Sequence, residues 1–205
     1  MRITKEEAAD NRARVLKAAS RLFREKGYDG VGVADLMQAA GLTHGGFYNH
    51  FASKEELAAE ASALAFEGAL ASLAARANVA SEAAQARAFA DYVRSYLAPE
   101  TRDAPSVRCP MAALGTDAAR QGPAVRRVFA DGVKRYLAGF TALVPGARKR
   151  RTDSEAARRA ESITIFAALV GALTLSRSVA GEDRKLADEI LVAVRDELIG
   201  SAARR

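Results

Sequence analysis

The side chains between Gly41 and Leu57 have the types and spacing expected of a surface that binds a polyanion. The stretch reads GLTHGGFYNHFASKEEL. Gly45 and Gly46 fall in the first turn of an expected short helix, where each costs about 1 kcal/mol of helix propensity relative to alanine. Lys54 falls in the first turn of the next helix, where a cation opposes the helix dipole. Both features fit close approach to phosphates, which backbone amides and Lys54 would hold together; the alternative is a solvent-facing lysine and glycines without a role.

Short signals at helix ends place this stretch between two helices. Gly41 is expected to end the preceding helix, because a left-handed residue after a helix end is least costly for glycine. Thr43 is expected to cap a helix over residues 44–50. Ser53 and Glu56 form a capping box for the longer helix that follows. Helix, glycine turn and helix are the helix-turn-helix pattern.

The order of residues from Arg12 to Leu57 resembles the DNA-binding domain of TetR-family transcriptional regulators. The matching residues are Ala18, Ala19, Leu22, Phe23, Gly27, Tyr28, Val33, Asp35, Leu36, Ala39, Ala40, Gly41, Phe47, Tyr48, His50, Phe51 and Ser53 to Leu57. The resemblance implies that Tyr48 and Lys54 hold phosphates while other residues of the short helix face the groove. These groove-facing residues would be Thr43, His44, Gly45, Gly46 and Asn49.

Several positions of this segment keep a second interpretation. His50 is either a DNA contact or a partly buried histidine with satisfied hydrogen bonds, and Asn49 could contact a base or a phosphate. Phe47 and Phe51 are expected to pack inward. At the start of the second helix, Gly32 lacks the hydroxyl that the family usually offers there, so we expect fewer phosphate contacts and a shallower salt dependence.

Net charge alone does not locate a nucleic-acid surface. The chain of 205 residues has a formal charge of +6, but residues 101–151 hold the excess, with eleven basic and three acidic side chains. Near the start of the sequence, four basic side chains could still reach backbone phosphates. They are Arg2, Lys5, Arg12 and Arg14. A basic run over residues 148–151 is interpreted as a solvated loop.

Composition favours a helical protein and disfavours several other classes. Alanine is abundant and there are five prolines, which favours an all-α fold. A single cysteine excludes an internal disulfide framework. The most apolar stretch, residues 163–175, is too short to span a bilayer, and the charged first residues do not resemble a signal peptide. We therefore expect a cytoplasmic protein without a membrane partner.

Helical periodicity and punctuation divide the chain into about nine helices. We expect a three-helix helix-turn-helix domain over residues 1–53, followed by a helical effector-binding and dimerisation domain over residues 54–205. A loop is expected over residues 100–107, before a helix that begins at Pro110. The other helices are expected over residues 5–26, 33–40, 44–50, 54–77, 82–97, 124–143, 154–179 and 182–199.

The second domain contains aromatic and sulfur-containing residues at helical spacing. A ligand between the helices over 54–77 and 124–143 would change the spacing of the two DNA-binding heads. The residues suggest an apolar effector, although such residues more often form core. The candidates are Phe66, Phe89, Tyr92, Tyr96, Cys109, Met111, Phe129, Tyr136 and Phe166. The resemblance also implies a four-helix dimer interface from the last two helices, containing Phe166, Val170, Leu175, Ile190 and Val194.

Cys109 precedes Pro110, which suits the first position of a helix. The positive helix end and Arg108 would lower the pKa of an accessible thiol, which would favour a sensor of oxidants or electrophiles. The alternative is a small buried hydrophobic residue. The segment from Cys109 to Leu114 resembles that of a TetR-family subgroup in which some members sense electrophiles through cysteine.

These observations predict a DNA-binding transcriptional regulator rather than an enzyme. We expect a ligand- or redox-responsive repressor that binds a palindromic operator as a homodimer, with a small apolar or electrophilic effector. No nucleophile, metal or phosphate-loop motif is present, so no cofactor or metal is expected. Within the class an activator or a thiol-based electrophile sensor remains open, and outside it a basic amphipathic membrane-surface protein.

Overall fold

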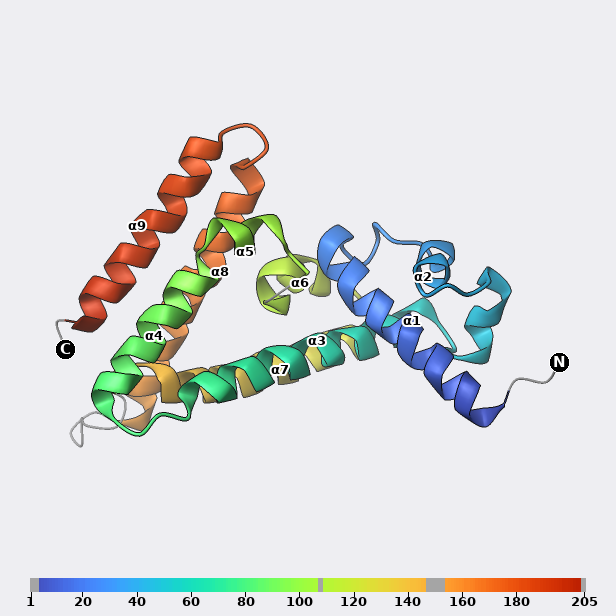
Figure 1. Ribbon diagram of the computed structural model, residues 1–205, viewed down its shortest axis with the longest axis horizontal. Coiled ribbons are helices and arrows are strands. Elements are labelled where there is room, and N and C mark those ends of the chain that lie inside the picture. Colours follow the sequence, from blue (N-terminus) through green and yellow to red (C-terminus); the bar gives the residue numbers. More distant parts are fainter. Residues whose placement is uncertain (1–3, 107–108, 147–153, 204–205) are drawn as a thin grey trace.

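The computed structural model describes residues 4–106, 109–146 and 154–203, which form helices joined by turns and loops. Over these ranges there are nine α-helices and one short 3₁₀ helix, η1, which confirms the all-α prediction (Figure 1). Their bounds are α1 Lys5–Lys26, α2 Val33–Ala39, η1 His44–Asn49, α3 Lys54–Ala77, α4 Glu82–Tyr96, α5 Pro99–Asp103, α6 Pro110–Ala118, α7 Pro123–Leu143, α8 Glu155–Val179 and α9 Arg184–Ala203.

The first three helices form a small head around one end of α3. Helix α1 begins at a capping box, in which the Thr4 hydroxyl accepts from the Glu7 amide and the Glu7 carboxylate accepts from the Thr4 amide. It ends at Gly27, whose φ of +75° favours glycine. The apolar stripe of α1 packs on α3 and α2, η1 packs on α2, and these helices share one core. Its fully buried large side chains are Phe23, Tyr28, Leu36, Met37, Phe47, Phe51 and Leu57.

Helices α3 and α7 lie side by side and form the long middle of the molecule (Figure 1). Their close approach depends on Gly132, because a Cβ atom there would lie 2.5 Å from the ring of Phe66. The starts of the two helices are joined by the Glu55 carboxylate, which accepts from the Ala124 amide at 3.2 Å. The head is therefore attached to a rigid pair of helices.

Helices α8 and α9 pair at the end of the molecule opposite the head, with α4 packed against them (Figure 1). The short helix α5 lies against this pair because two arginines hold it. Arg102 is buried and donates to Asp103 and to Asp188 of α9. Arg177 of α8 donates to the carbonyls of Thr101 and Arg102.

The helix over Pro99–Asp103 corrects the loop predicted for residues 100–107. Pro99 occupies the first position of this helix, where its missing amide costs nothing. The last helix begins at Arg184 and extends to Ala203, beyond the predicted bounds of 182–199. The basic run over 148–151 lies outside the described residues.

Helices α3 and α8 are both long and apolar enough, by length and composition, to cross a membrane. For α8 this finding corrects the prediction that its apolar stretch was too short. About 44% of the apolar window of α3 and 39% of that of α8 are buried inside the fold. Core helices of soluble proteins pass the same test, so the finding is weak evidence for a membrane span.

Candidate nucleic-acid interface and effector cavity

The helix-turn-helix turn is a complete Schellman motif at the end of α2. Gly41 has a φ of +69°, and its amide donates to the Gln38 carbonyl at 2.9 Å. The Leu42 amide donates to the Met37 carbonyl, also at 2.9 Å. These two bonds satisfy carbonyls that the helix end would otherwise leave unpaired. The prediction that Gly41 ends the helix is confirmed, and this turn directs η1 away from α2.

The caps that flank η1 differ in part from the prediction. The Thr43 side chain makes no cap hydrogen bond, because the Gly46 amide donates to the Thr43 carbonyl instead. The Ser53 hydroxyl accepts from the Glu56 amide at 3.0 Å, as expected. The Glu56 carboxylate, however, accepts from Ala52 at 2.6 Å rather than from Ser53. Thr43 is therefore not a side-chain cap, and the capping box is only half formed.

The short helix presents its polar residues to solvent and its apolar ones to the core. Phe47 is fully buried and stacks edge-on against Tyr48, whose side chain is 71% exposed. Phe51 is buried as predicted. Gly46, His50 and Lys54 are half-buried. The exposed residues beside Tyr48 are Thr43, His44, Gly45 and Asn49.

Gly45 has no atom within 4 Å of the position that a Cβ would occupy, and its φ is not in the left-handed region. Packing within the chain therefore does not require glycine at this position. The His50 carbonyl accepts from Arg12 at 3.3 Å, and no hydrogen bond of the His50 ring is found within the described chain. This leaves the imidazole available, although half-buried.

Two of the predicted phosphate-binding cations are used inside the fold. Arg12 lies over the ring of Phe51 and pairs with Glu60 at 2.6 Å. Arg14 donates to the Ala40 carbonyl at 2.5 Å. Both therefore stabilise the packing of α1 rather than extend toward a ligand, and their partners lie too far along the chain to be seen in the sequence. Lys5 is exposed, and Arg2 lies outside the described residues.

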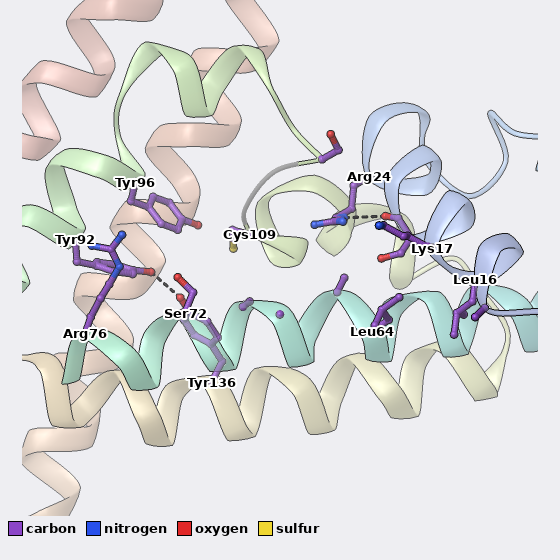
Figure 2. A pocket seen from close by; sticks show the side chains of 16 residues that line it. Leu16, Lys17, Arg24, Leu64, Ser72, Arg76, Tyr92, Tyr96, Cys109 and Tyr136 are labelled. Carbon is purple, nitrogen blue, oxygen red and sulfur yellow. Dashed lines mark hydrogen bonds between the residues drawn. The ribbon is translucent and has the colours of Figure 1, made fainter. Parts of the chain in front are cut away.

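A cavity of about 770 Å³ lies between α1 of the head and the helices of the second domain (Figure 2). Pockets that bind small molecules have volumes of about 300–1,000 Å³. The ligand was predicted to lie between the helices over 54–77 and 124–143, so the contribution of α1 to the cavity was not expected. The lining residues are Ala13, Leu16, Lys17, Ser20, Arg24, Leu64, Ala65, Gly68, Ala69, Ser72, Arg76, Tyr92, Tyr96, Ser106, Cys109 and Tyr136.

Four of the nine predicted ligand residues line this cavity, namely Tyr92, Tyr96, Cys109 and Tyr136. The Tyr92 and Tyr136 hydroxyls form a hydrogen bond of 2.8 Å, drawn as a dashed line in Figure 2. The other five do not line it, because they pack against other core side chains. These five are Phe66, Phe89, Met111, Phe129 and Phe166.

Cys109 is the N-cap of α6, as predicted, but it is buried. Burial raises the pKa of the Cys109 thiol, while smaller effects from Tyr96 and the first amides of α6 act to lower it. The condition of solvent access is not met, and the structure supports the alternative interpretation of Cys109 as a small buried residue. Arg108, its other expected activator, lies outside the described residues. The thiol faces the cavity beside Tyr96 (Figure 2).

The predicted dimer residues are divided between core and surface. Phe166 is buried against Tyr136 and Phe140, so it is not available to a partner. Leu175 is 59% exposed, whereas Val170, Ile190 and Val194 are half-buried. Further exposed apolar side chains of α8 and α9 are Ile163, Leu186 and Val192.

The fold and this surface define an all-α protein with a helix-turn-helix head on a larger helical domain. The family model described as "Bacterial regulatory proteins, tetR family" matches residues 15–61. This match assigns the helix-turn-helix head of the chain to the TetR family of transcriptional regulators.

Among similar proteins, the transcriptional regulator TtgR of Pseudomonas putida is 44% identical over 57 residues, which are 28% of this chain and 27% of TtgR. The match to such curated relatives thus spans about a quarter of their length. A TetR transcriptional regulator from Chloroflexus aurantiacus has a similar structure, with a TM-score of 0.76 and 26% identity over 98% of both chains. One from Agrobacterium tumefaciens has the same TM-score at 19% identity, over 95% of this chain and 98% of that one, and supports the fold alone.

Proposed function

We propose that the protein is a sequence-specific DNA-binding regulator of transcription that acts as a homodimer. The observation that carries the proposal is the polar face of η1, with Tyr48 exposed beside a buried Phe47 in a helix-turn-helix. The Tyr48 side chain lies on the exposed polar face of η1, so its hydroxyl is accessible to a ligand there. Its hydroxyl can donate to a phosphate oxygen.

The roles of the individual residues follow from their places on the head. Tyr48 and Lys54 hold phosphates on either side of the groove, and the amides at the start of α3 add to the attraction. The base-reading face consists of Thr43, His44, Gly45 and Asn49, with Gly46 close to the backbone. His50 contributes a contact only from the edge of this face, because it is half-buried.

A single head contacts few bases, which supports a dimer on a palindromic operator. A two-fold dimer places its two heads in successive major grooves about 34 Å apart. The exposed apolar residues of α8 and α9 offer the surface that such a dimer requires. We assign residues 1–53 to DNA binding and residues 54–205 to effector binding and dimerisation.

The cavity supports control by a small effector, which would act by preferring one arrangement of the heads. Repression by occupying the operator is the simplest outcome of such binding, and we propose a cytoplasmic repressor. The buried, protonated state of Cys109 disfavours the thiol-sensor alternative.

Selection from randomised duplexes tests the proposal first. We expect the selected sites to be palindromic, and the protein to bind them more tightly than a scrambled duplex across a salt series. The double variant Tyr48→Phe with Lys54→Ala should lose at least tenfold in affinity while keeping its helical content. Lys134→Ala, which removes an exposed lysine of α7, is the matched control. Equal binding to selected and scrambled duplexes would overturn sequence-specific recognition.

A further inference from the structure

The charged residues of the cavity are all basic. Lys17 and Arg24 come from α1 and Arg76 from the far part of α3, and none of the described lining residues is Asp or Glu. In Figure 2, Lys17 and Arg24 lie together at one end, while Arg76 lies beside Tyr92 at the other. A neutral apolar ligand would leave Lys17 and Arg24 without a partner.

Arg24 is partly desolvated without a carboxylate to compensate. Its Nε donates to the Ser20 carbonyl at 2.8 Å, which orients the guanidinium along α1. Burial lowers the pKa of Arg24, against a weaker effect of Glu25. Glu25 itself pairs with Arg21 at 2.9 Å, and no ion pair of Lys17 or Arg24 is found among the described residues. An anion beside Arg24 would therefore relieve an unfavourable burial of charge.

One buried hydroxyl group of a cavity-lining residue has no hydrogen-bond partner among the described residues. It is the Ser20 Oγ on α1, whereas the Tyr96 hydroxyl on α4, which also lacks a short hydrogen bond, interacts with the Cys109 thiol. Buried polar groups are almost always paired, so the unpaired Ser20 hydroxyl makes the end of the cavity beside Arg24 its more polar end. Ser20 lies one helical turn before Arg24, on the same face of α1.

The cavity wall between its two ends is apolar. Leu16 of α1 and Leu64 of α3 lie beside Lys17 and Arg24 (Figure 2), and α3 continues with Ala65, Gly68 and Ala69. Leu64 is 41% exposed, which is unusual for a leucine on a helix that is otherwise packed. A ligand with an apolar chain would cover this strip of α3.

We propose that the cavity binds an amphipathic anion, a carboxylate on an apolar chain, with its carboxylate at Lys17 and Arg24 and its chain along α3 toward Tyr96. Charge-assisted hydrogen bonds are about twice as strong as neutral ones, so the two cations set the preference for a carboxylate. The proposal deepens the proposed function. It rests on that function only where the ligand is called an effector of DNA binding. It also narrows the apolar effector expected from the sequence to one that carries a negative charge.

A carboxylate bound at Lys17 and Arg24 would contact α1, which is part of the head. Helix α1 belongs to the head, whereas α3 and α4 belong to the proposed effector domain. A ligand held by both would favour the one arrangement of α1 on α3 in which its two ends are satisfied. No relay through the core is needed for such coupling.

Titration calorimetry of the full chain with three decyl compounds tests the assignment without DNA. We expect decanoate to bind, and decanol and decylamine to bind at least tenfold more weakly, all below their aggregation concentrations. The variant Lys17→Ala with Arg24→Ala should lose at least tenfold in affinity for decanoate and little for decanol. Arg21→Ala with Lys26→Ala removes the same charge from α1 outside the cavity and should bind decanoate as the unchanged protein does.

Several results would overturn the assignment. They are equal binding of decanoate and decanol, an equal loss in the control variant, and no binding of decanoate at all. Because these titrations contain no DNA, their outcome is separate from that of operator selection. If an operator is found, decanoate should release the unchanged protein but not the Lys17 and Arg24 variant. A loss of DNA affinity in that variant without ligand, with a shallower salt dependence, would instead make the two cations phosphate contacts.

Discussion

At the scale of single residues, the head separates positions that stabilise the fold from positions that remain free for a ligand. Gly45 is the clearest case, because a Cβ there would meet nothing in the chain. The loss of helix propensity at Gly45 is therefore not offset by packing. Close approach to a DNA groove would explain why glycine is present.

Gly45→Ala should therefore change the stability of the fold and the affinity for DNA in different directions. We expect its free energy of unfolding to stay equal or rise, by up to about 1 kcal/mol, and its affinity for a selected operator to fall about tenfold. Denaturation in urea and fluorescence anisotropy measure the two quantities. Gly115→Ala, in an equally open position of α6, should gain similar stability without loss of affinity. Unchanged operator affinity in Gly45→Ala would remove this residue from the interface.

Cys109 gives a second prediction at this scale, which concerns reactivity. Because burial raises the pKa of its thiol, the reactive thiolate is scarcer in the native protein than in the unfolded chain. Alkylation by iodoacetamide at pH 7.5 should be at least tenfold slower in the native protein than in urea, and in the native protein its rate should keep rising as the pH passes the ordinary range of thiols. A native rate equal to the unfolded one would restore the sensor hypothesis, and Cys109→Ser supplies the blank.

The residue scale also shows what the sequence could predict. The burial of Phe47 agrees with the prediction that it packs inward, and the exposure of Tyr48 is compatible with the phosphate contact that the family resemblance implies. The intramolecular partners of Arg12 and Arg14 could not be predicted, because Glu60 and Ala40 are far along the chain. Local signals fix which side of a helix a residue occupies, whereas long-range pairing decides what a flexible cation contacts.

At the scale of elements, the long pair of α3 and α7 sets the distance between the head and the α8–α9 end. Gly132→Ala should therefore weaken the fold, because the added Cβ would meet the buried ring of Phe66 at 2.5 Å. We expect a loss of about 1–3 kcal/mol in the free energy of unfolding. Gly139→Ala, whose Cβ would lie 3.2 Å from the flexible end of Leu73, should cost less.

The double variant Gly132→Ala with Phe66→Leu tests the reason for that loss. If the clash is with the ring, the smaller side chain should restore part of the stability that Gly132→Ala removes. Additive losses in the double variant would show that the glycine serves another purpose. Operator affinity measured alongside would report whether the spacing of α3 and α7 also positions the head.

Element boundaries were largely predictable, and the exceptions have physical causes. Capping residues and glycines located the first helices to within a residue or two. Helix α5 was missed because its arginines make it stable through contacts with α8 and α9, which no local pattern reveals. The contribution of α1 to the cavity could not be predicted for the same reason, because α1 and α3 come into contact only in the folded protein.

At the scale of the whole molecule, the head and the larger domain are connected at several points. The Tyr28 hydroxyl shares a hydrogen bond of 2.7 Å with Ser62 of α3, and Gln121 donates to Asp29 at 3.5 Å. Burial raises the pKa of Tyr28 to about 12, so this bond is kept throughout the physiological pH range. A ligand that shifts α1 on α3 would therefore have to strain these contacts between the head and the larger domain.

A shift of the head changes DNA affinity only if two heads are fixed relative to each other. Control of DNA binding by a ligand would therefore require the proposed dimer. The exposed side of α8 combines Leu175 and Ile163 with the small residues Ala167 and Gly171, a surface on which a second helix can pack closely. Charge placed there should separate the subunits, because an unpaired carboxylate cannot be buried without a large cost.

Leu175→Glu should therefore be monomeric by sedimentation velocity at micromolar concentration, with a helical content equal to that of the unchanged protein. Its affinity for a palindromic site should fall at least a hundredfold, to that of a single head on a half-site, because the second head no longer binds from the same complex. Leu64→Glu places the same charge on an exposed leucine at the cavity and should leave the dimer intact. A Leu175→Glu protein that stays dimeric would place the interface on another surface, and the operator geometry would have to be derived again from that surface.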